Sequence, residues 1–147
     1  MKILKSPSRY IQGAGALKEL PSLLDSFGEK VLFIVSFSGE KRVRPIIEQE
    51  LIDIGLWYRF EYLTGECSQQ AIDALIDVVR EEKIDLIVGV GGGKIIDAAK
   101  AVSYFTEKNV VIVPTIASSD AACSALSILY HENGVFDRYL HLKKIRC

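Results

Sequence analysis

The sequence predicts an α/β fold, a Rossmann-like arrangement of a largely parallel sheet with flanking helices, ending in a β-hairpin. Three observations predict it. Short apolar runs such as residues 31–35, rich in β-branched side chains, alternate with segments of helical periodicity. Three consecutive glycines, residues 91–93, stand between such a run and a helical segment. An Asn-Gly pair at 133–134, which favours a hairpin turn, lies between two β-rich segments.

The first half of the chain contains two strands and three helices by these criteria. Leu residues at helical spacing predict a helix over 14–27, with Pro21 bending it or delaying its start. The expected order continues with a strand over 31–35, a loop over 36–39, a helix over 45–54, a strand over 57–63, and a helix capped by Ser68.

The second half repeats the pattern. Residues 84–90 form an apolar run that predicts a buried strand, and residues 95–105 have helical spacing. The expected order then has a strand over 110–113, a long polar loop over 115–124, and a hairpin of 125–130 and 135–140. No repeat or linker divides the chain, so residues 1–147 are expected to form one domain.

Composition excludes several classes of function. The chain has 147 residues, of which 49% are hydrophobic and 25% charged, with 18 Lys and Arg against 19 Asp and Glu. This balance gives no basic surface for nucleic acid or for an anionic membrane. The apolar runs are shorter than the roughly 20 residues that span a bilayer. The first ten residues lack a signal-peptide core, so the chain is expected in the cytoplasm.

Cysteine and histidine are too few for an intrinsic metal site. Cys67, Cys123 and Cys147 form no Cys-x-x-Cys pair and are expected to be reduced thiols. His131 and His141 do not have the spacing of a metal-binding helix motif, and His131 beside the Asn-Gly turn is expected to face solvent.

The glycine segment, residues 89–94, is the first candidate binding site. Glycines between a strand and a helix let backbone N–H groups approach an anion, and a pyrophosphate suits that geometry. Lys94 adds a positive charge, and Asp97 is expected in the first helical turn, where it could hold a ribose or nicotinamide group. Ile95 stands where a P-loop requires a hydroxyl, and Lys94 where the common dinucleotide motif requires glycine. A tight turn without a ligand remains the alternative.

The second candidate site follows the strand at 110–113. Residues 115–120 bring three hydroxyls and the carboxylate of Asp120 to a strand end, where α/β sheets bind ligands. They could bond a cofactor ring or a polyol. Taken alone, the segment is better explained by hydroxyls that cap a helix and a solvated Asp120.

Four segments together resemble a known family. Residues 6–13, 65–68, 91–97 and 114–127 are similar, in order, to the glycerol dehydrogenase branch of the metal-dependent, or iron-containing, alcohol dehydrogenase superfamily. The resemblance implies an NAD-binding domain and a small polyol substrate such as glycerol. It assigns Gly92, Gly93, Lys94 and Asp97 to the cofactor's pyrophosphate region, Asp120 to the substrate hydroxyls, and Thr115, Ser118, Ser124, Leu126 and Tyr130 to the adenine or nicotinamide portions.

Two departures from the family pattern affect the function. Ser36 matches the position of an Asp that contacts the adenosine ribose, which leaves the preference between NAD and NADP open. The family's helical domain, which supplies one Asp and two His ligands to zinc, is expected to be absent from this chain. No catalytic residue and no metal ligand is therefore assigned within it.

The resemblance implies the cofactor-binding part of an NAD-dependent oxidoreductase that converts a polyol to a ketone by hydride transfer. It is expected to be inactive unless a separate chain supplies the metal domain, and to form a homo-oligomer. One alternative is a non-catalytic dinucleotide-binding fragment or the remnant of a broken gene. Another is a dehydroquinate synthase-like lyase, which the segment 118–127 argues against.

Overall fold

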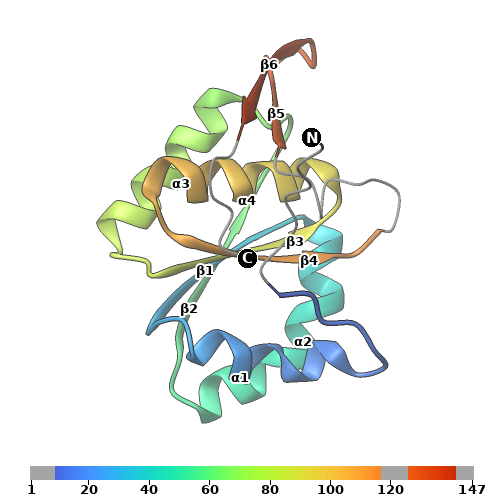
Figure 1. Ribbon diagram of the computed structural model, residues 1–147, viewed down its shortest axis with the longest axis vertical. Coiled ribbons are helices and arrows are strands. Elements are labelled where there is room, and N and C mark those ends of the chain that lie inside the picture. The colour runs from blue at the N-terminus through green and yellow to red at the C-terminus, as the bar shows by residue number, and fades with distance from the viewer. Residues whose placement is uncertain (1–8, 117–125, 142–147) are drawn as a thin grey trace, which may run out of the picture.

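A four-stranded parallel sheet forms the centre of the computed structural model, which describes residues 9–116 and 126–141. The strand order is β2-β1-β3-β4, and helices cover both faces, with α1 and α2 on one side and α3 and α4 on the other (Figure 1). The predicted Rossmann-like fold is confirmed. The strands are β1 (Lys30–Val35), β2 (Trp57–Tyr62), β3 (Leu86–Gly91) and β4 (Asn109–Pro114), and the helices α1 (Leu20–Asp25), α2 (Phe37–Asp53), α3 (Gln69–Glu81) and α4 (Gly93–Thr106).

The two central strands are apolar on both faces because helices cover both. All six residues of β3 are buried, and so are the last five of β1. Such continuous apolar runs are typical of parallel sheets covered on both sides. On the α1 and α2 face, Phe33 is fully buried and stacks on Phe60 with ring centroids 4.7 Å apart.

Helix α3 confirms the local signals that predicted it. The Ser68 hydroxyl accepts a hydrogen bond from the backbone N–H of Ala71 at 3.2 Å and so caps the helix. A stripe of four apolar side chains faces the sheet: Ile72, Leu75, Ile76 and Val79. The hydrogen bond satisfies one N–H of the first turn, and the stripe supplies the packing energy.

Helix α2 begins eight residues before its predicted start. The loop predicted over 36–39 is wrong, because α2 begins at Phe37 directly after β1 and Pro45 lies inside it. Glycine is needed at position 39 for a tertiary reason: a Cβ at this residue would lie 2.8 Å from the carbonyl oxygen of Val90. The glycine therefore allows α2 to approach the end of β3 closely and does not mark a loop.

The first predicted helix is shorter and divided. A 3-10 turn, Ala16–Glu19, precedes α1, and Pro21 lies in the first turn of α1, so the predicted delay at Pro21 is confirmed. Elsewhere the predicted bounds hold within two residues, including α4, which begins at Gly93. None of the helices in the described part of the chain is long and apolar enough to cross a membrane.

The predicted hairpin is present as β5 (Leu126–Tyr130) and β6 (Phe136–His141), which stands beside α3 and α4 (Figure 1). Its turn differs from a two-residue Asn-Gly turn. The N–H of His131 donates to the carbonyl of Val135 at 2.8 Å, which leaves three residues in the loop. Gly134 takes the left-handed conformation, with φ 83°, that such three-residue loops need.

Gly89 sets how closely α4 approaches the sheet. A Cβ at this position would lie 2.6 Å from the Cβ of Ala99, a separation that real side chains do not show. We expect Gly89→Ala to lower the free energy of unfolding by about 1 to 2 kcal/mol, at the lower end of the usual overpacking range because only one methyl is added. Urea unfolding measures this change. An unchanged midpoint would show that α4 can move away from β3 without cost.

Candidate functional site

The candidate site lies where the chain direction in the sheet reverses. From β1 the chain runs outward to β2, and from β3 it runs outward to β4, so the carboxyl ends of β1 and β3 meet at the switch point. Val35 pairs with Val90 in the register of these strands. Ser36 and Gly91 therefore follow neighbouring positions on adjacent strands. Ligands of open α/β sheets bind in the crevice at such a point.

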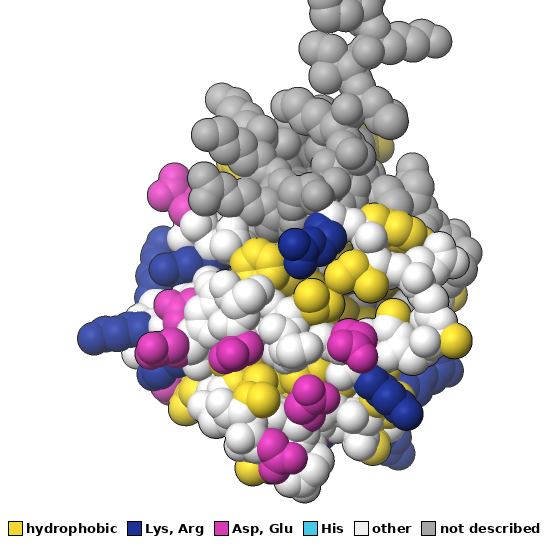
Figure 2. Space-filling view, turned by 60° about the horizontal axis from the view of Figure 1, so that its bottom comes forward, with side chains coloured by type: hydrophobic (Ala, Val, Ile, Leu, Met, Phe, Trp, Pro, Cys, Tyr) yellow, Lys and Arg dark blue, Asp and Glu magenta, His cyan; other side chains and the backbone are white. Residues whose placement is uncertain are grey.

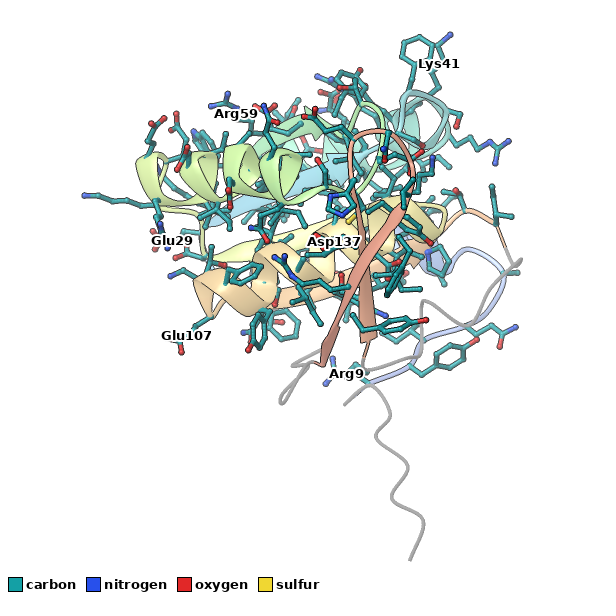
Figure 3. All side chains as sticks on the ribbon, turned by 90° about the horizontal axis from the view of Figure 1, so that it is seen from above. Arg9, Glu29, Lys41, Arg59, Glu107 and Asp137 are labelled. Atoms are coloured by element: carbon teal, nitrogen blue, oxygen red, sulfur yellow. The ribbon has the colours of Figure 1, made fainter. Side chains whose placement is uncertain are left out.

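Two helices begin at this switch point from opposite faces of the sheet. Helix α2 begins after Ser36 and α4 begins after Gly92, and their lengths are 17 and 14 residues. In Figure 3, Lys41 of α2 lies at one end of the molecule, whereas Glu29 before β1 and Glu107 after α4 lie toward the other. The N-terminal ends of both helices carry partial positive charge, so the crevice favours an anion.

The glycines of this segment have different roles. A Cβ at Gly91 would lie 2.7 Å from Cγ1 of Ile95, so Gly91 permits the tight turn into α4. A Cβ at Gly92 would meet only Cδ1 of Ile116, at an ordinary 3.8 Å. Gly92 also caps α4 without any side-chain hydrogen bond. Packing against the described residues therefore does not require a glycine at position 92.

Lys94 forms an ion pair in this structure. Its ammonium lies 2.8 Å from Oε1 of Glu66, which belongs to the loop between β2 and α3. The Lys94 side chain is 57% exposed and that of Glu66 only 24%. Gly93 and Lys94 belong to the first turn of α4 and are not in a loop. Glu66 did not stand out in the sequence because the two residues are 28 positions apart.

Asp97 lies deeper than its expected position. Because α4 begins at Gly93, Asp97 falls in the second turn and not in the first, and it is 8% exposed. Its carbonyl accepts a hydrogen bond from the Ser127 hydroxyl at 2.7 Å, which joins α4 to β5. Burial raises the pKa of the neighbouring Cys67 thiol to about 12, helped by the negative charges of Asp97 and Glu66. Cys67 is therefore a protonated, packed thiol at neutral pH.

Ser36 stands at the end of β1 as expected and caps α2. Its hydroxyl oxygen accepts a hydrogen bond from the N–H of Gly39 at 3.1 Å and lies 3.4 Å from the hydroxyl of Ser38. The nearby Glu40 carboxylate is 2.6 Å from the guanidinium of Arg44 and also accepts from the Tyr62 hydroxyl. The Glu40 carboxylate, in the first turn of α2, is thus already bound to side chains of α2 and β2.

An exposed ring and an exposed cation flank Ser36. Phe37 is 64% exposed and packs near Tyr62 with ring centroids 6.4 Å apart. The Lys41 ammonium lies 4.4 Å from the centre of the Phe37 ring, and Figure 3 shows this side chain extending away from the molecule. An apolar ring and a cation therefore stand beside the end of β1.

The second candidate segment is described only in part. The N–H of Thr115 donates to the carbonyl of Gly91 at 3.1 Å, which brings Thr115 beside the glycine segment. Tyr130 is half-buried in β5, and its N–H donates to the carbonyl of Cys67 at 2.9 Å. Leu126 begins β5. Ser118, Asp120 and Ser124 lie outside the described residues.

The structure gathers part of the predicted set at the switch point. Ser36, Gly92, Gly93, Lys94 and Thr115 follow the carboxyl ends of β1, β3 and β4, which are neighbouring strands. Asp97 is one turn further into α4. Tyr130 is hydrogen-bonded through its backbone N–H to Cys67, in the loop between β2 and α3. The site-forming edge is therefore built from three strand ends and the start of two helices.

No metal centre is found in the part of the chain that the structure describes. Among residues 9–116 and 126–141, no group of three or more His, Cys, Asp or Glu side chains could hold a metal ion. His131 is exposed in the hairpin turn, 3.7 Å from Asp137, as a solvent-facing residue would be. On the face in Figure 2, acidic and basic side chains both occur and no continuous basic area is visible.

Alignments with known proteins cover nearly the whole chain. Residues 7–145 match the family of iron-containing alcohol dehydrogenases. Glycerol dehydrogenase of Thermotoga maritima is 45% identical over 140 residues, and that of Pseudomonas putida 42% over 141 residues. These alignments cover 94% and 96% of this chain but 37% and 39% of those enzymes.

A solved structure agrees with the sequence relatives. A probable glycerol dehydrogenase from Sinorhizobium meliloti superposes with a TM-score of 0.85 at 37% identity, covering 97% of this chain and 38% of that one. The chain thus spans about two fifths of the length of the proteins it matches. Sequence, fold and the glycine segment agree, and the chain belongs to the iron-containing alcohol dehydrogenase family.

Proposed function

We propose that this chain is the cofactor-binding part of an NAD-dependent oxidoreductase of the glycerol dehydrogenase type, which oxidises glycerol or a similar polyol to a ketone. The observation that carries the proposal is the glycine turn between β3 and α4 at the switch point of the sheet. Relatives named glycerol dehydrogenase, similar over almost the whole chain, support it. They favour an oxidoreductase over the lyase alternative.

The described residues have distinct tasks in this proposal. The backbone N–H groups of Gly93 and Lys94 bind the pyrophosphate at the N-terminus of α4, and Gly92 leaves room for it. The Lys94 ammonium supplies an additional positive charge. Ser36 hydrogen-bonds the adenosine ribose at the end of β1, and Thr115 borders the site from β4. When bound, the nicotinamide accepts the hydride that the substrate loses.

Substrate and metal binding are the less complete part of the proposal. Asp120 would hold the substrate hydroxyls, and Ser118, Ser124, Leu126 and Tyr130 would contact the cofactor, as in the family. The described residues do not form a metal site. We therefore give none of them a role as a metal ligand. We infer that the metal, with zinc as the expected ion, is held by residues outside the described part, in a further part of the protein or in a companion chain. We also propose that the protein forms a homo-oligomer.

Replacing Lys94 tests the cofactor site. We expect Lys94→Ala to weaken NADH binding about fivefold, because a partly exposed ammonium contributes roughly 1 kcal/mol to binding an anion. Titration followed by the fluorescence of the reduced nicotinamide measures the dissociation constant.

Lys108→Ala is the matched control for this test. It removes the same charge from the opposite end of α4, beside Asn109 at the start of β4, and should leave the constant unchanged. If the folded wild-type chain does not bind NADH, the proposed function is wrong. If NADH binds and Lys94→Ala binds equally well, the assignment of Lys94 is wrong.

An activity assay separates the enzyme from a binding fragment. The isolated chain is expected to bind NADH and to show no glycerol-dependent NADH formation, and a companion chain that carries metal ligands is expected to restore it. Turnover by the isolated chain with zinc alone would contradict the need for a companion. Binding without turnover under every combination would support the non-catalytic alternative.

A further inference from the structure

Glu66 forms an ion pair with Lys94, the positively charged residue that the proposed cofactor site needs. Its Oε1 lies 2.8 Å from the Lys94 ammonium. Glu66 belongs to the loop between β2 and α3, and Lys94 to the first turn of α4. The ion pair therefore joins this loop to the start of α4, beside the glycine turn.

The loop that carries Glu66 is held in place at both ends. The N–H of Leu63 donates to the carbonyl of Val35 at 3.2 Å, which fixes the start of the loop to the end of β1. The carbonyl of Cys67 accepts from the N–H of Tyr130 at 2.9 Å, which fixes its end to the hairpin. The Glu66 side chain is only 24% exposed, so its carboxylate has a defined position.

The Glu66 carboxylate acts on the buried Cys67 thiol beside it in the loop. Burial raises the pKa of that thiol, and Asp97 and Glu66 raise it further. A pyrophosphate that enters beside Gly92 meets an ammonium that is already paired with the Glu66 carboxylate. The attraction of Lys94 for the cofactor is therefore reduced by the interaction that it must give up.

We infer that Glu66 is a competing counter-ion of Lys94 that weakens dinucleotide binding, and that the pyrophosphate must displace its carboxylate from the ammonium. The inference rests on the proposed function. It makes Glu66 a positioning residue that acts through Lys94. Cofactor binding thereby loosens one contact of the loop between β2 and α3.

Substitution of Glu66 tests the inference, because competition predicts that affinity for the cofactor increases when the carboxylate is removed. Isothermal titration with NADH and with ADP-ribose, which has the same pyrophosphate without the nicotinamide, measures the constants for wild type and Glu66→Gln. We expect Glu66→Gln to bind both ligands about two- to fivefold more tightly, the range of a partly exposed ion pair. In a Lys94→Ala background, Glu66→Gln should change neither constant.

Glu61→Gln is the matched control. Glu61 is 27% exposed and paired with Arg59 at 2.6 Å, so this variant removes the same charge from an equivalent ion pair that does not involve the glycine turn. It should bind both ligands as the wild type does.

The outcomes separate the two proposals. Equal or weaker binding by Glu66→Gln contradicts competition, and so does a gain that persists without Lys94 or that Glu61→Gln reproduces. Absence of NADH binding by the folded wild type contradicts the proposed function itself, and the inference with it.

Discussion

Gly92→Ala is expected to weaken NADH binding about ten- to hundredfold and to leave the fold intact. Among the described residues the added methyl would meet only Ile116, at an ordinary contact distance. It would stand where the proposal places the pyrophosphate and would keep it from the backbone N–H groups. Hydrogen bonds to charged groups contribute roughly 1.5 to 3 kcal/mol, which corresponds to this range. Fluorescence titration with NADH measures the loss.

Thermal unfolding shows whether this loss is local. Gly92 has φ −87° and ψ −167°, which alanine adopts readily, so the free energy of unfolding should change by less than about 1 kcal/mol. Gly91→Ala provides the contrast, because its methyl would collide with Ile95 and should destabilise the protein as well. Unchanged NADH binding by a stable Gly92→Ala variant would place the cofactor elsewhere.

Ser36→Asp is expected to lower the affinity for NADPH about tenfold or more and to preserve binding of NADH. The carboxylate can accept a hydrogen bond from the ribose 2′-hydroxyl of NADH, whereas it repels the 2′-phosphate of NADPH. Aspartate caps a helix as well as serine does, so the contact with the N–H of Gly39 should survive. The ratio of the two dissociation constants measures the effect.

Ser36→Asn separates charge from shape in this experiment. Asparagine caps α2 and resembles aspartate in size but carries no charge, so the ratio should stay near the wild-type value. The wild-type ratio itself shows whether a serine at this position admits both cofactors. If Ser36→Asp and Ser36→Asn give the same ratio, Ser36 does not face the 2′ position.

Local signals sufficed wherever neighbouring residues determine the structure. The cap at Ser68 and the apolar stripe of α3 lie within one continuous segment, and the prediction of that helix is confirmed. The order of β1, β3 and their helices followed from alternating patterns in the same way. Parallel strands with buried faces leave an unambiguous apolar signature.

Features set by distant residues were missed. Gly39 and Pro45 indicated a loop and a late helix start. In the structure α2 includes both residues, and Gly39 is a glycine because the carbonyl of Val90 leaves no room for a side chain. The ion pair between Glu66 and Lys94 joins separate units of the fold. The resemblance to the family supplied Ser36 as a candidate, whereas residue patterns alone did not.

The two helices that begin at the switch point have a kinetic consequence. The chain carries 18 basic and 19 acidic residues, so it has almost no net charge to draw an anion from a distance. The partial charges of the two helix ends act over only the last few ångströms. Capture of an anionic ligand should thus occur at an ordinary diffusional rate that added salt changes little, and selectivity should be expressed in how long the ligand stays.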